Sequence, residues 1–235
     1  MKTFITSKVK LIKTYLRYYT TRNRFESKIF CISFQRTGTT STGKFFMMHG
    51  FPVANWYISR NSRWTRLWFN GEYEQIFNSF VFKHGGVFED DPWWCLDFYK
   101  VLFHRFPDSK FILFTRDSDK WFNSMVSHSK GKTLGNTQIH TKLYGRELEY
   151  LDKFGDHDNN NRIDNLLDLN ETHRSHYKKI YELRNQEIMD FFNKNDPSRL
   201  INLKLEDDDK WQKLGNYFNI KVDLNFKIHA NASKR

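Results

Sequence analysis

The sequence predicts an α/β fold of three layers, in which a central parallel β-sheet is flanked by helices. Two short apolar runs, residues 29–34 and 110–115, have the composition of strands that are buried on both faces. Helical periodicity follows each run, over residues 39–46 and 119–126. Strands that alternate with helical segments are joined by right-handed crossovers, which produce a parallel sheet covered by helices.

Length, composition and charge limit the domain organisation and the partners. The chain has 235 residues, of which 17% are aromatic, and a formal net charge of +11. Large rings supply the buried area that offsets chain entropy, so this composition excludes a disordered chain. We predict one α/β domain over residues 28–235. The positive charge favours a polyanionic partner, and it does not choose among a nucleotide, a sulfated substrate, nucleic acid and acidic lipid.

Residues 1–27 are predicted to form a basic amphipathic helix in front of that domain. Residues 1–28 contain eight Lys or Arg and one Glu, and apolar residues recur among them at steps of three and four. We expect the helix to pack on the domain, and a weak contact with a membrane surface is the alternative. No signal peptide and no apolar run of about 20 residues is evident. With only two cysteines, we expect a cytoplasmic, reducing location.

Weaker patterns predict the remaining elements of the domain. They indicate strands at residues 53–58 and 200–205, and helices at residues 177–192 and 210–218. Asp90, Asp91 and Pro92 indicate the start of another helix, because an acidic cap followed by proline suits a first turn. That helix is predicted to run to about Phe106.

A loop rich in small residues follows the first strand. Gly38 allows the backbone a sharp turn, and the hydroxyl residues after it favour the start of a helix. Backbone N–H groups at a helix N-terminus attract anions, and Arg36 adds a full positive charge with a fork of donors. The loop is therefore predicted to bind a phosphate or sulfate group. Its predicted binding residues are Arg36, Thr37, Gly38, Thr39, Thr40 and Ser41.

A second anion site is expected where the strand at residues 110–115 ends. Ligands of parallel sheets lie beyond the carboxyl ends of the strands, and Arg116 occupies such an end. Ser124 follows eight residues later, about two turns along the next helix. The two side chains could hold one phosphate from two directions, although an Arg and a Ser at this spacing mean little on their own.

Together the two sites resemble the nucleotide-binding motifs of the P-loop sulfotransferases. QRTGTTS at residues 35–41 is similar to the loop of that family that binds the 5′-phosphosulfate. RDSDKWFNS at residues 116–124 is similar to its 3′-phosphate motif, with Arg and Ser at the same separation. The resemblance covers about residues 28–220, and it includes Leu143-Tyr144-Gly145 and the segment 200–220.

The resemblance implies a P-loop-type α/β fold and a sulfotransferase reaction. The donor would be 3′-phosphoadenosine 5′-phosphosulfate, the product adenosine 3′,5′-bisphosphate, and the acceptor a hydroxyl or amine of a carbohydrate or small molecule. Arg36 takes the place of a Lys that many members direct at the sulfuryl group, residues 37–41 would bind the 5′-phosphosulfate, and Arg116 and Ser124 the 3′-phosphate. No metal is required, because positioned cations and N–H dipoles stabilise the transferred charge, and no nucleic-acid partner is expected.

An in-line sulfuryl transfer also needs a group that takes the proton of the acceptor. Asp91 is the preferred candidate for this general base, and Asp90 and His84 are the alternatives. A structural role is open for each of them as well. The Asp residues could cap a helix beside Pro92, and His84 could be an ordinary loop residue.

Two other functions compete with a sulfotransferase. Residues 38–44 match the G-x-x-x-x-G-K part of a kinase or NTPase P-loop, but Phe45 stands where Ser or Thr would bind magnesium. Lys44 also falls a full turn inside the predicted helix, so it need not reach a phosphate. A non-catalytic binder of polyanions would suit the charge, although no nucleic-acid motif is present.

A polar segment imitates a calcium-binding loop. Its oxygen-bearing residues are Asp156, Asp158, Asn160 and Asp164. The imitation is incomplete, because Asn161 replaces the turn glycine and Leu167 stands where the closing acidic ligand belongs. We expect an ordinary solvated loop here and no metal site.

Overall fold

The computed structural model describes residue 16 and residues 27–128, 137–155 and 165–228. The helix predicted over residues 1–27 therefore lies outside the described residues, apart from Leu16 and Ser27, as do the four oxygen-bearing residues of the calcium-like loop. The described residues up to Phe114 and from Ser198 onward form one compact unit, and those from Thr115 to Pro197 form a second. The single domain predicted over residues 28–235 stays a prediction.

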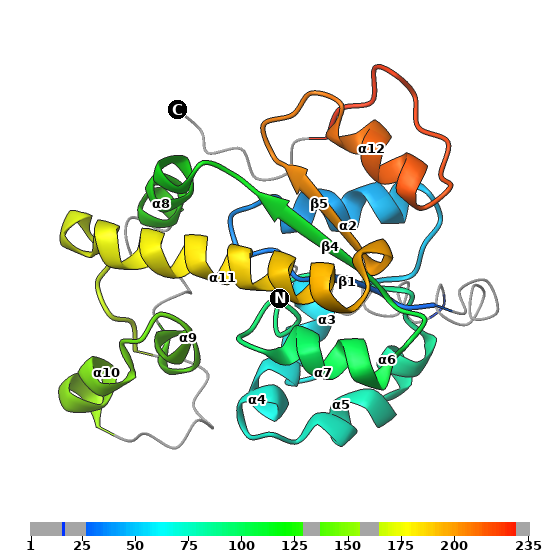
Figure 1. Cartoon of the computed structure of the whole chain (residues 1–235). Helices are drawn as coiled ribbons and strands as arrows, with labels where there is room; N and C mark the ends of the chain where they lie inside the picture. Colours follow the sequence, from blue (N-terminus) through cyan, green and yellow to red (C-terminus); the bar gives the residue numbers. More distant parts are fainter. Residues whose placement is uncertain (1–15, 17–26, 129–136, 156–164, 229–235) are drawn as a thin grey trace, which may run out of the picture. The chain divides into compact units, whose positions relative to one another are not determined.

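Five strands form one sheet in the order β2-β3-β1-β4-β5. They are β1 Ile29–Cys31, β2 Val53–Ala54, β3 Val87–Phe88, β4 Lys110–Thr115 and β5 Leu200–Lys204. β1 pairs in parallel with β3 and β4, β2 pairs in parallel with β3, and β5 points the same way as β4 in Figure 1. The predicted α/β fold with a central parallel sheet is confirmed. β3 was not predicted, since two residues are too few to show a period.

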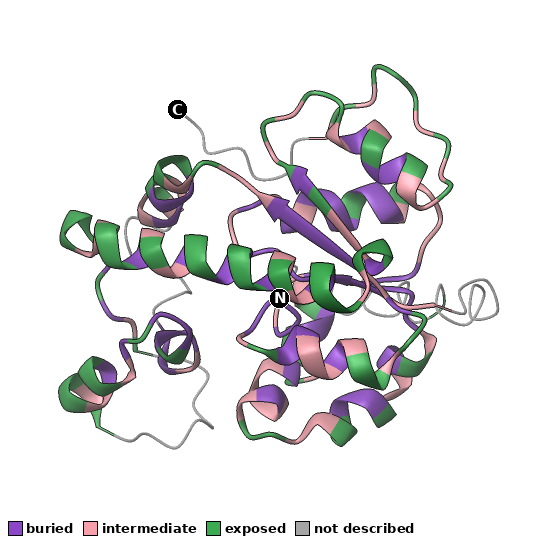
Figure 2. Cartoon of the chain, in the orientation of Figure 1, coloured by how far each residue is buried: buried purple, intermediate pink, exposed green. Residues whose placement is uncertain are grey.

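One face of the sheet is covered by α2 Thr39–Met48 and α12 Lys210–Tyr217. Phe45 of α2 stacks on Trp211 of α12, with ring centroids 5.5 Å apart, and both pack with Ile29, Ile112 and Phe114. The interior residues of β4 are buried, and Figure 2 shows this strand in the colour of buried residues along most of its length. This face is the aliphatic and aromatic core that fixes α2 against the sheet.

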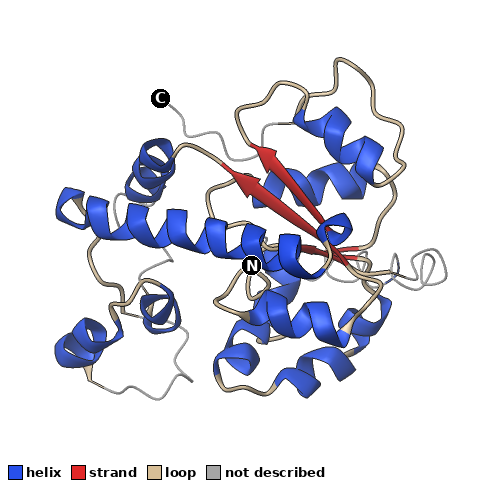
Figure 3. Ribbon diagram, viewed as in Figure 1, coloured by secondary structure: helices blue, strands red, loops and turns tan. Residues whose placement is uncertain are grey.

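The opposite face carries an aromatic cluster around Phe30. Its ring centroid lies 5.3 Å from that of Phe88, 5.4 Å from Trp93 and 5.6 Å from Phe111. Figure 3 shows helices on both sides of the strands in this unit. Alternate residues of β1 thus serve two cores, which explains why the strand is apolar throughout. The three-layer prediction follows from this pattern and is confirmed.

The first unit also contains several short helices on the way from β2 to β4. These are α3 Trp56–Asn61, α4 Trp64–Phe69, α5 Tyr73–Asn78, α6 Phe80–His84 and α7 Phe98–Arg105. The 3₁₀ helix η4 Pro197–Arg199 begins at the last residue of the second unit's main segment and precedes β5. The strand predicted at residues 53–58 was wrong beyond Ala54. Asn55 accepts hydrogen bonds from the N–H groups of Tyr57 and Ile58, so it caps a helix there.

The helix predicted to start at Pro92 starts later. Asp90 has a φ of 74°, in the left-handed region, and the Asp91–Pro92 peptide bond is cis. The N–H groups of Trp93 and Cys95 bond to carbonyls three residues back, so successive turns occupy the segment before α7 begins at Phe98. The acidic pair is therefore a turn and not a helix cap.

The second unit is helical, with α8 Ser118–Ser127, α9 Gln138–Leu143, α10 Glu147–Phe154, the 3₁₀ helix η3 Glu171–His173 and α11 Arg174–Asn195. The helices predicted at residues 119–126 and 177–192 are confirmed. Asp119 of α8 binds Arg174 at 3.0 Å and Lys178 at 2.6 Å, which ties α8 to α11. Within the described chain, no helix combines the length and apolar character that a membrane span requires.

Candidate active site

The loop between β1 and α2 has the backbone conformation of an anion-binding loop at a helix N-terminus. Gly38, the N-cap of α2, has a φ of 91°, and a Cβ atom there would lie 2.8 Å from Cδ1 of Leu205. The backbone conformation therefore favours glycine, and any side chain there would also have to displace the end of Leu205. Gly38 has no side chain to cap the helix, and the first turn holds no acidic residue, so no carboxylate of α2's own first turn neutralises the positive end of the helix dipole.

Arg36 and Thr37 occupy the turn before that glycine. Arg36 has a φ of 67° and is half-buried. Thr37 is fully buried, and both its N–H and its hydroxyl donate to the carbonyl oxygen of Phe34. In this structure the donors of Thr37 thus close the turn, and its predicted contact with the 5′-phosphosulfate stays a prediction. Thr39 and Ser41 are largely buried, whereas Thr40 is half-buried.

Ser33 fixes the start of the loop to the neighbouring strand. Its hydroxyl accepts from the N–H of Phe114 at 2.7 Å and donates to the carbonyl oxygen of Ile112 at 3.3 Å. It therefore joins the carboxyl ends of β1 and β4, from which the two predicted anion-binding segments leave. The sequence reasoning missed this residue, since a serine at the end of a strand has no distinctive pattern.

Lys44 and Phe45 stand at the lysine and magnesium-ligand positions of a kinase P-loop, but their surroundings do not suit those roles. Lys44 is exposed on the second turn of α2. Phe45, at the magnesium-ligand position of that motif, is fully buried and stacked on Trp211. The apparent G-x-x-x-x-G-K match thus reflects helix packing and not a magnesium nucleotide site.

Arg116 and Ser124 belong to the second unit. Arg116 directly follows β4, and its backbone N–H donates to the hydroxyl oxygen of Tyr181 at 2.9 Å. The ring of Tyr181 stacks on Trp121 of α8 at 4.3 Å. Tyr181 thereby positions both the backbone of Arg116 and the helix that carries Ser124. This aromatic residue was also missed, because its partner lies 65 residues away in the sequence.

The three candidates for the general base lie at two different edges of the sheet. Asp90 and Asp91 follow β3 at its carboxyl end, the edge from which the loop leaves β1. His84 ends α6 and precedes β3, at the opposite edge, and its Nδ1 lies 2.9 Å from the carbonyl oxygen of Phe80. The structure therefore brings the two Asp residues to the edge of the loop and does not bring His84 there.

Glu89 is a third acid in this turn that the sequence reasoning missed. Its side chain is 3% exposed and packs against α2, where a Cβ atom at Gly43 would lie 2.9 Å from its Cγ. Burial, and then the charges of Asp90 and Asp91, raise the pKa of Glu89 well above its ordinary value, while a hydrogen bond from the Trp56 backbone opposes the rise. No sequence signal pointed to Glu89, because β3, the strand before it, has only two residues.

The raised pKa of Glu89 predicts a pH-dependent stability. The folded protein holds this proton more tightly than the unfolded chain, so the resulting stabilisation is full below the ordinary pKa of 4.5 and is lost as the pH rises toward the folded pKa. Relative to Glu89→Gln, the wild-type protein should therefore lose thermal stability as the pH rises above the ordinary pKa of 4.5 toward the folded pKa. Melting curves of both proteins over this range measure the difference, and parallel pH profiles would contradict it.

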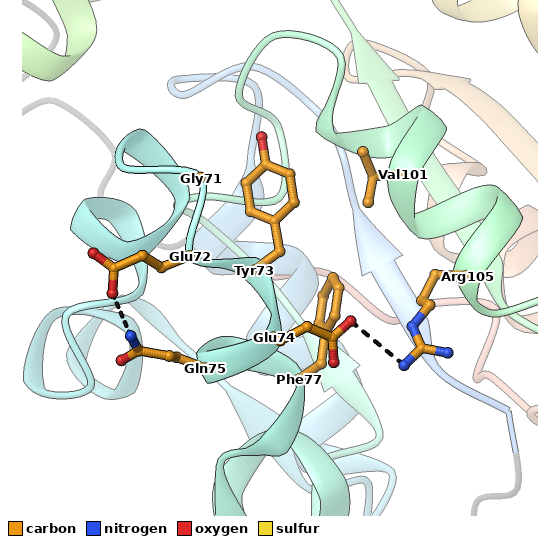
Figure 4. A pocket seen from close by; sticks show the side chains of 8 residues that line it. All are labelled: Gly71, Glu72, Tyr73, Glu74, Gln75, Phe77, Val101 and Arg105. Carbon is orange, nitrogen blue, oxygen red and sulfur yellow. Dashed lines mark hydrogen bonds and ion pairs between the residues drawn. The ribbon is translucent and has the colours of Figure 1, made fainter.

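A shallow pocket of about 330 Å³ lies apart from these residues (Figure 4). Its lining residues are Gly71, Glu72, Tyr73, Glu74, Gln75, Phe77, Val101 and Arg105. None of the predicted site residues is among them, and the pair Glu74–Arg105, at 3.5 Å, crosses it. The described residues contain no cluster of three His, Cys, Asp or Glu side chains that could hold a metal ion.

The parallel sheet, the glycine turn after β1 and the helix that follows define a P-loop-type α/β protein with an anion-binding loop. A family model described as a sulfotransferase domain matches residues 28–226. The chain belongs to this family and is a sulfotransferase. No curated protein matches the chain. The resemblance of the two motifs is thus confirmed at the level of the family, which generally uses 3′-phosphoadenosine 5′-phosphosulfate.

Proposed function

We propose that the protein transfers the sulfuryl group of 3′-phosphoadenosine 5′-phosphosulfate to a hydroxyl or amine of a carbohydrate or small molecule. The observation that carries the proposal is the start of α2, where a glycine in the left-handed region and a neighbouring Arg36 precede a helix without an acidic first turn. Family membership supports the choice of a sulfuryl donor over other anions. The acceptor class rests on the sequence resemblance.

Each residue predicted to bind the nucleotide has a role in this reaction. Arg36 and the N-terminus of α2 bind the 5′-phosphosulfate and stabilise the charge that builds on the equatorial oxygens and the leaving phosphate. Thr37 shapes the turn, and the hydroxyl groups of residues 39–41 supply further donors. Arg116 and Ser124 bind the 3′-phosphate. A carboxyl of the turn after β3 takes the proton of the acceptor, with Asp91 and Asp90 as the candidates from sequence.

The proposed reaction needs no metal and no nucleic-acid partner. No metal is needed, since Arg36 and the helix N-terminus supply the positive charge. A cytoplasmic location agrees with Cys31 and Cys95, which are both buried as thiols. Contact of the predicted N-terminal helix with the domain or with a membrane surface remains part of the proposal, and no nucleic-acid partner is proposed.

A magnesium-dependent nucleotide kinase is the nearest competitor. The exposed Lys44 and the buried Phe45 argue against it, because that chemistry needs a lysine at the phosphates and a hydroxyl on magnesium. A non-catalytic polyanion binder would not need a glycine turn at a helix N-terminus. The kinase predicts a preference for ATP with magnesium, whereas the polyanion binder predicts no specific nucleotide binding.

Thermal shift with nucleotides tests the proposal. Saturating adenosine 3′,5′-bisphosphate, at about 100 times its Kd, should stabilise the protein by about 2.7 kcal/mol and raise the Tm by roughly 5 °C or more. Adenosine 5′-monophosphate, which lacks the 3′-phosphate, should give a smaller shift, and Arg116→Ala should reduce the larger shift to the smaller one. Preference for ATP with magnesium would favour the kinase, and salt-sensitive nucleic-acid binding without a nucleotide shift would favour the polyanion binder.

A further inference from the structure

The carboxyl group of Glu89 is a buried acid without an assigned task. Its Oε2 atom is buried and has no hydrogen-bond partner among the described residues. Buried polar atoms nearly always have such a partner, so a carboxyl oxygen without one requires an explanation, such as a catalytic role. The other oxygen is less isolated, since the carboxyl group accepts a hydrogen bond from the backbone of Trp56.

Glu89 lies close to the anion-binding loop. It directly follows β3, which pairs with β1 so that Phe88 stands opposite Phe30, and the loop leaves the same edge of the sheet. Its Oε1 atom would lie 3.0 Å from a Cβ atom at Gly43, so the carboxyl packs on the backbone of α2. Gly43 is four residues after the first residue of α2, which is about 6 Å along the helix axis. A side chain at Gly43 would displace the carboxyl, which gives a reason for glycine there.

Asp90 is more constrained than Glu89. Its Oδ1 accepts from the N–H of Asp91 at 3.0 Å, a bond that closes the turn itself. The carbonyl oxygen of Asp91 accepts from the hydroxyl of Ser59, which holds the Asp91 backbone. The carboxyl of Glu89 packs against α2, the helix of the anion-binding loop.

We infer that Glu89, in preference to Asp91, Asp90 and His84, is the general base of sulfuryl transfer, and that its Oε2 accepts the proton of the acceptor. This inference rests on the proposed function. As the acceptor oxygen forms a bond to sulfur, the bond from sulfur to the bridging oxygen breaks. The acceptor proton moves to Glu89 and later to solvent, the sulfate ester is released, and adenosine 3′,5′-bisphosphate leaves with the electron pair of the broken bond.

The groups around Glu89 suit this task. Asp90 and Asp91 of the same turn and the Cys31 thiol of β1 are its titratable neighbours, and the Trp56 backbone of α3 is its donor. Burial and the two Asp charges raise the pKa of Glu89, which makes it a stronger base than an ordinary carboxylate. The rate should therefore rise about tenfold per pH unit below that pKa, because only the ionised form accepts a proton.

Hydrolysis of 3′-phosphoadenosine 5′-phosphosulfate, with water as the acceptor, tests the inference without a known substrate. The rate of adenosine 3′,5′-bisphosphate release is measured from about pH 5 to about pH 9 for the wild type, Glu89→Gln and Asp91→Asn. Glu74→Gln, an exposed surface acid, is the matched control for the Glu-to-Gln change. Calorimetry with adenosine 3′,5′-bisphosphate measures nucleotide affinity in parallel.

We expect Glu89→Gln to keep its nucleotide affinity within about threefold and to lose about 100-fold or more in rate, more than Asp91→Asn loses. The pH dependence of the wild type should disappear in Glu89→Gln and persist in Glu74→Gln. A Glu89→Gln rate within about threefold of wild type, or a larger loss in Asp91→Asn, would overturn the inference. If Glu89→Gln misfolds, a wild-type rate that does not rise with pH overturns it. Failure of the wild type to bind the nucleotide would instead refute the proposed function.

Discussion

Replacing Arg36 with alanine should weaken the binding of adenosine 3′,5′-bisphosphate by about 10- to 150-fold. A hydrogen bond to a charged group contributes about 1.5–3 kcal/mol, and Arg36 is the charged side chain of the loop that leads into α2. The loss should appear in calorimetry as a higher Kd at unchanged stoichiometry. Sulfuryl transfer should fall further, because the charge on the leaving phosphate is greater in the transition state than in the bound donor.

Two further substitutions separate the charge of Arg36 from its backbone conformation. Arg36 has a φ of 67°, which glycine adopts without strain, so Arg36→Gly removes the guanidinium and keeps the turn. It should bind the nucleotide as weakly as Arg36→Ala. Arg36→Lys retains a point charge and should recover part of the affinity. Affinity near wild type in Arg36→Gly would show that the backbone, and not the charge, explains the alanine result.

Replacing Arg199 with alanine should lower the stability of the protein by about 3–5 kcal/mol, because it leaves several buried carbonyl oxygens without a charged donor. Arg199 is 6% exposed and lies in η4, directly before β5. Its guanidinium donates to the carbonyl oxygens of Phe103 at 3.1 Å, Phe106 at 2.8 Å and Ser109 at 2.9 Å. The cation also lies 3.8 Å from the centroid of the Phe103 ring.

These contacts join the end of α7 and the start of β4 to the segment before β5. A loss of this size corresponds to a fall in Tm of roughly 10 °C, which differential scanning calorimetry resolves. Arg105→Ala is the matched control, since Arg105 is exposed and its pair with Glu74 should contribute less than about 1 kcal/mol. Equal effects of the two substitutions would refute the role of the buried guanidinium.

The strongest sequence patterns were also the most accurate predictions. The apolar runs that became β1 and β4, and the long helix α11, were predicted because burial on both faces and helical periodicity leave a clear record in the chain. The strand predicted beyond Ala54 was wrong, since the cap formed by Asn55 outweighs a short apolar run. β3 escaped notice because two residues carry no period, although its partners on both sides make it part of the sheet.

Sequence and structure contributed differently to the site. The glycine turn, Arg36, and the pair Arg116 and Ser124 were predicted from sequence, because local conformation and short motifs depend on residues that are neighbours in the chain. These residues and their motifs were enough to indicate the sulfotransferase family. Glu89 and Ser33 became visible only in the folded protein, because burial and hydrogen bonding depend on partners brought from distant segments. The same carboxyl would have an ordinary pKa in the unfolded chain. In the folded protein, burial and then the charges of Asp90 and Asp91 raise that pKa, and packing against Gly43 holds the carboxyl beside α2.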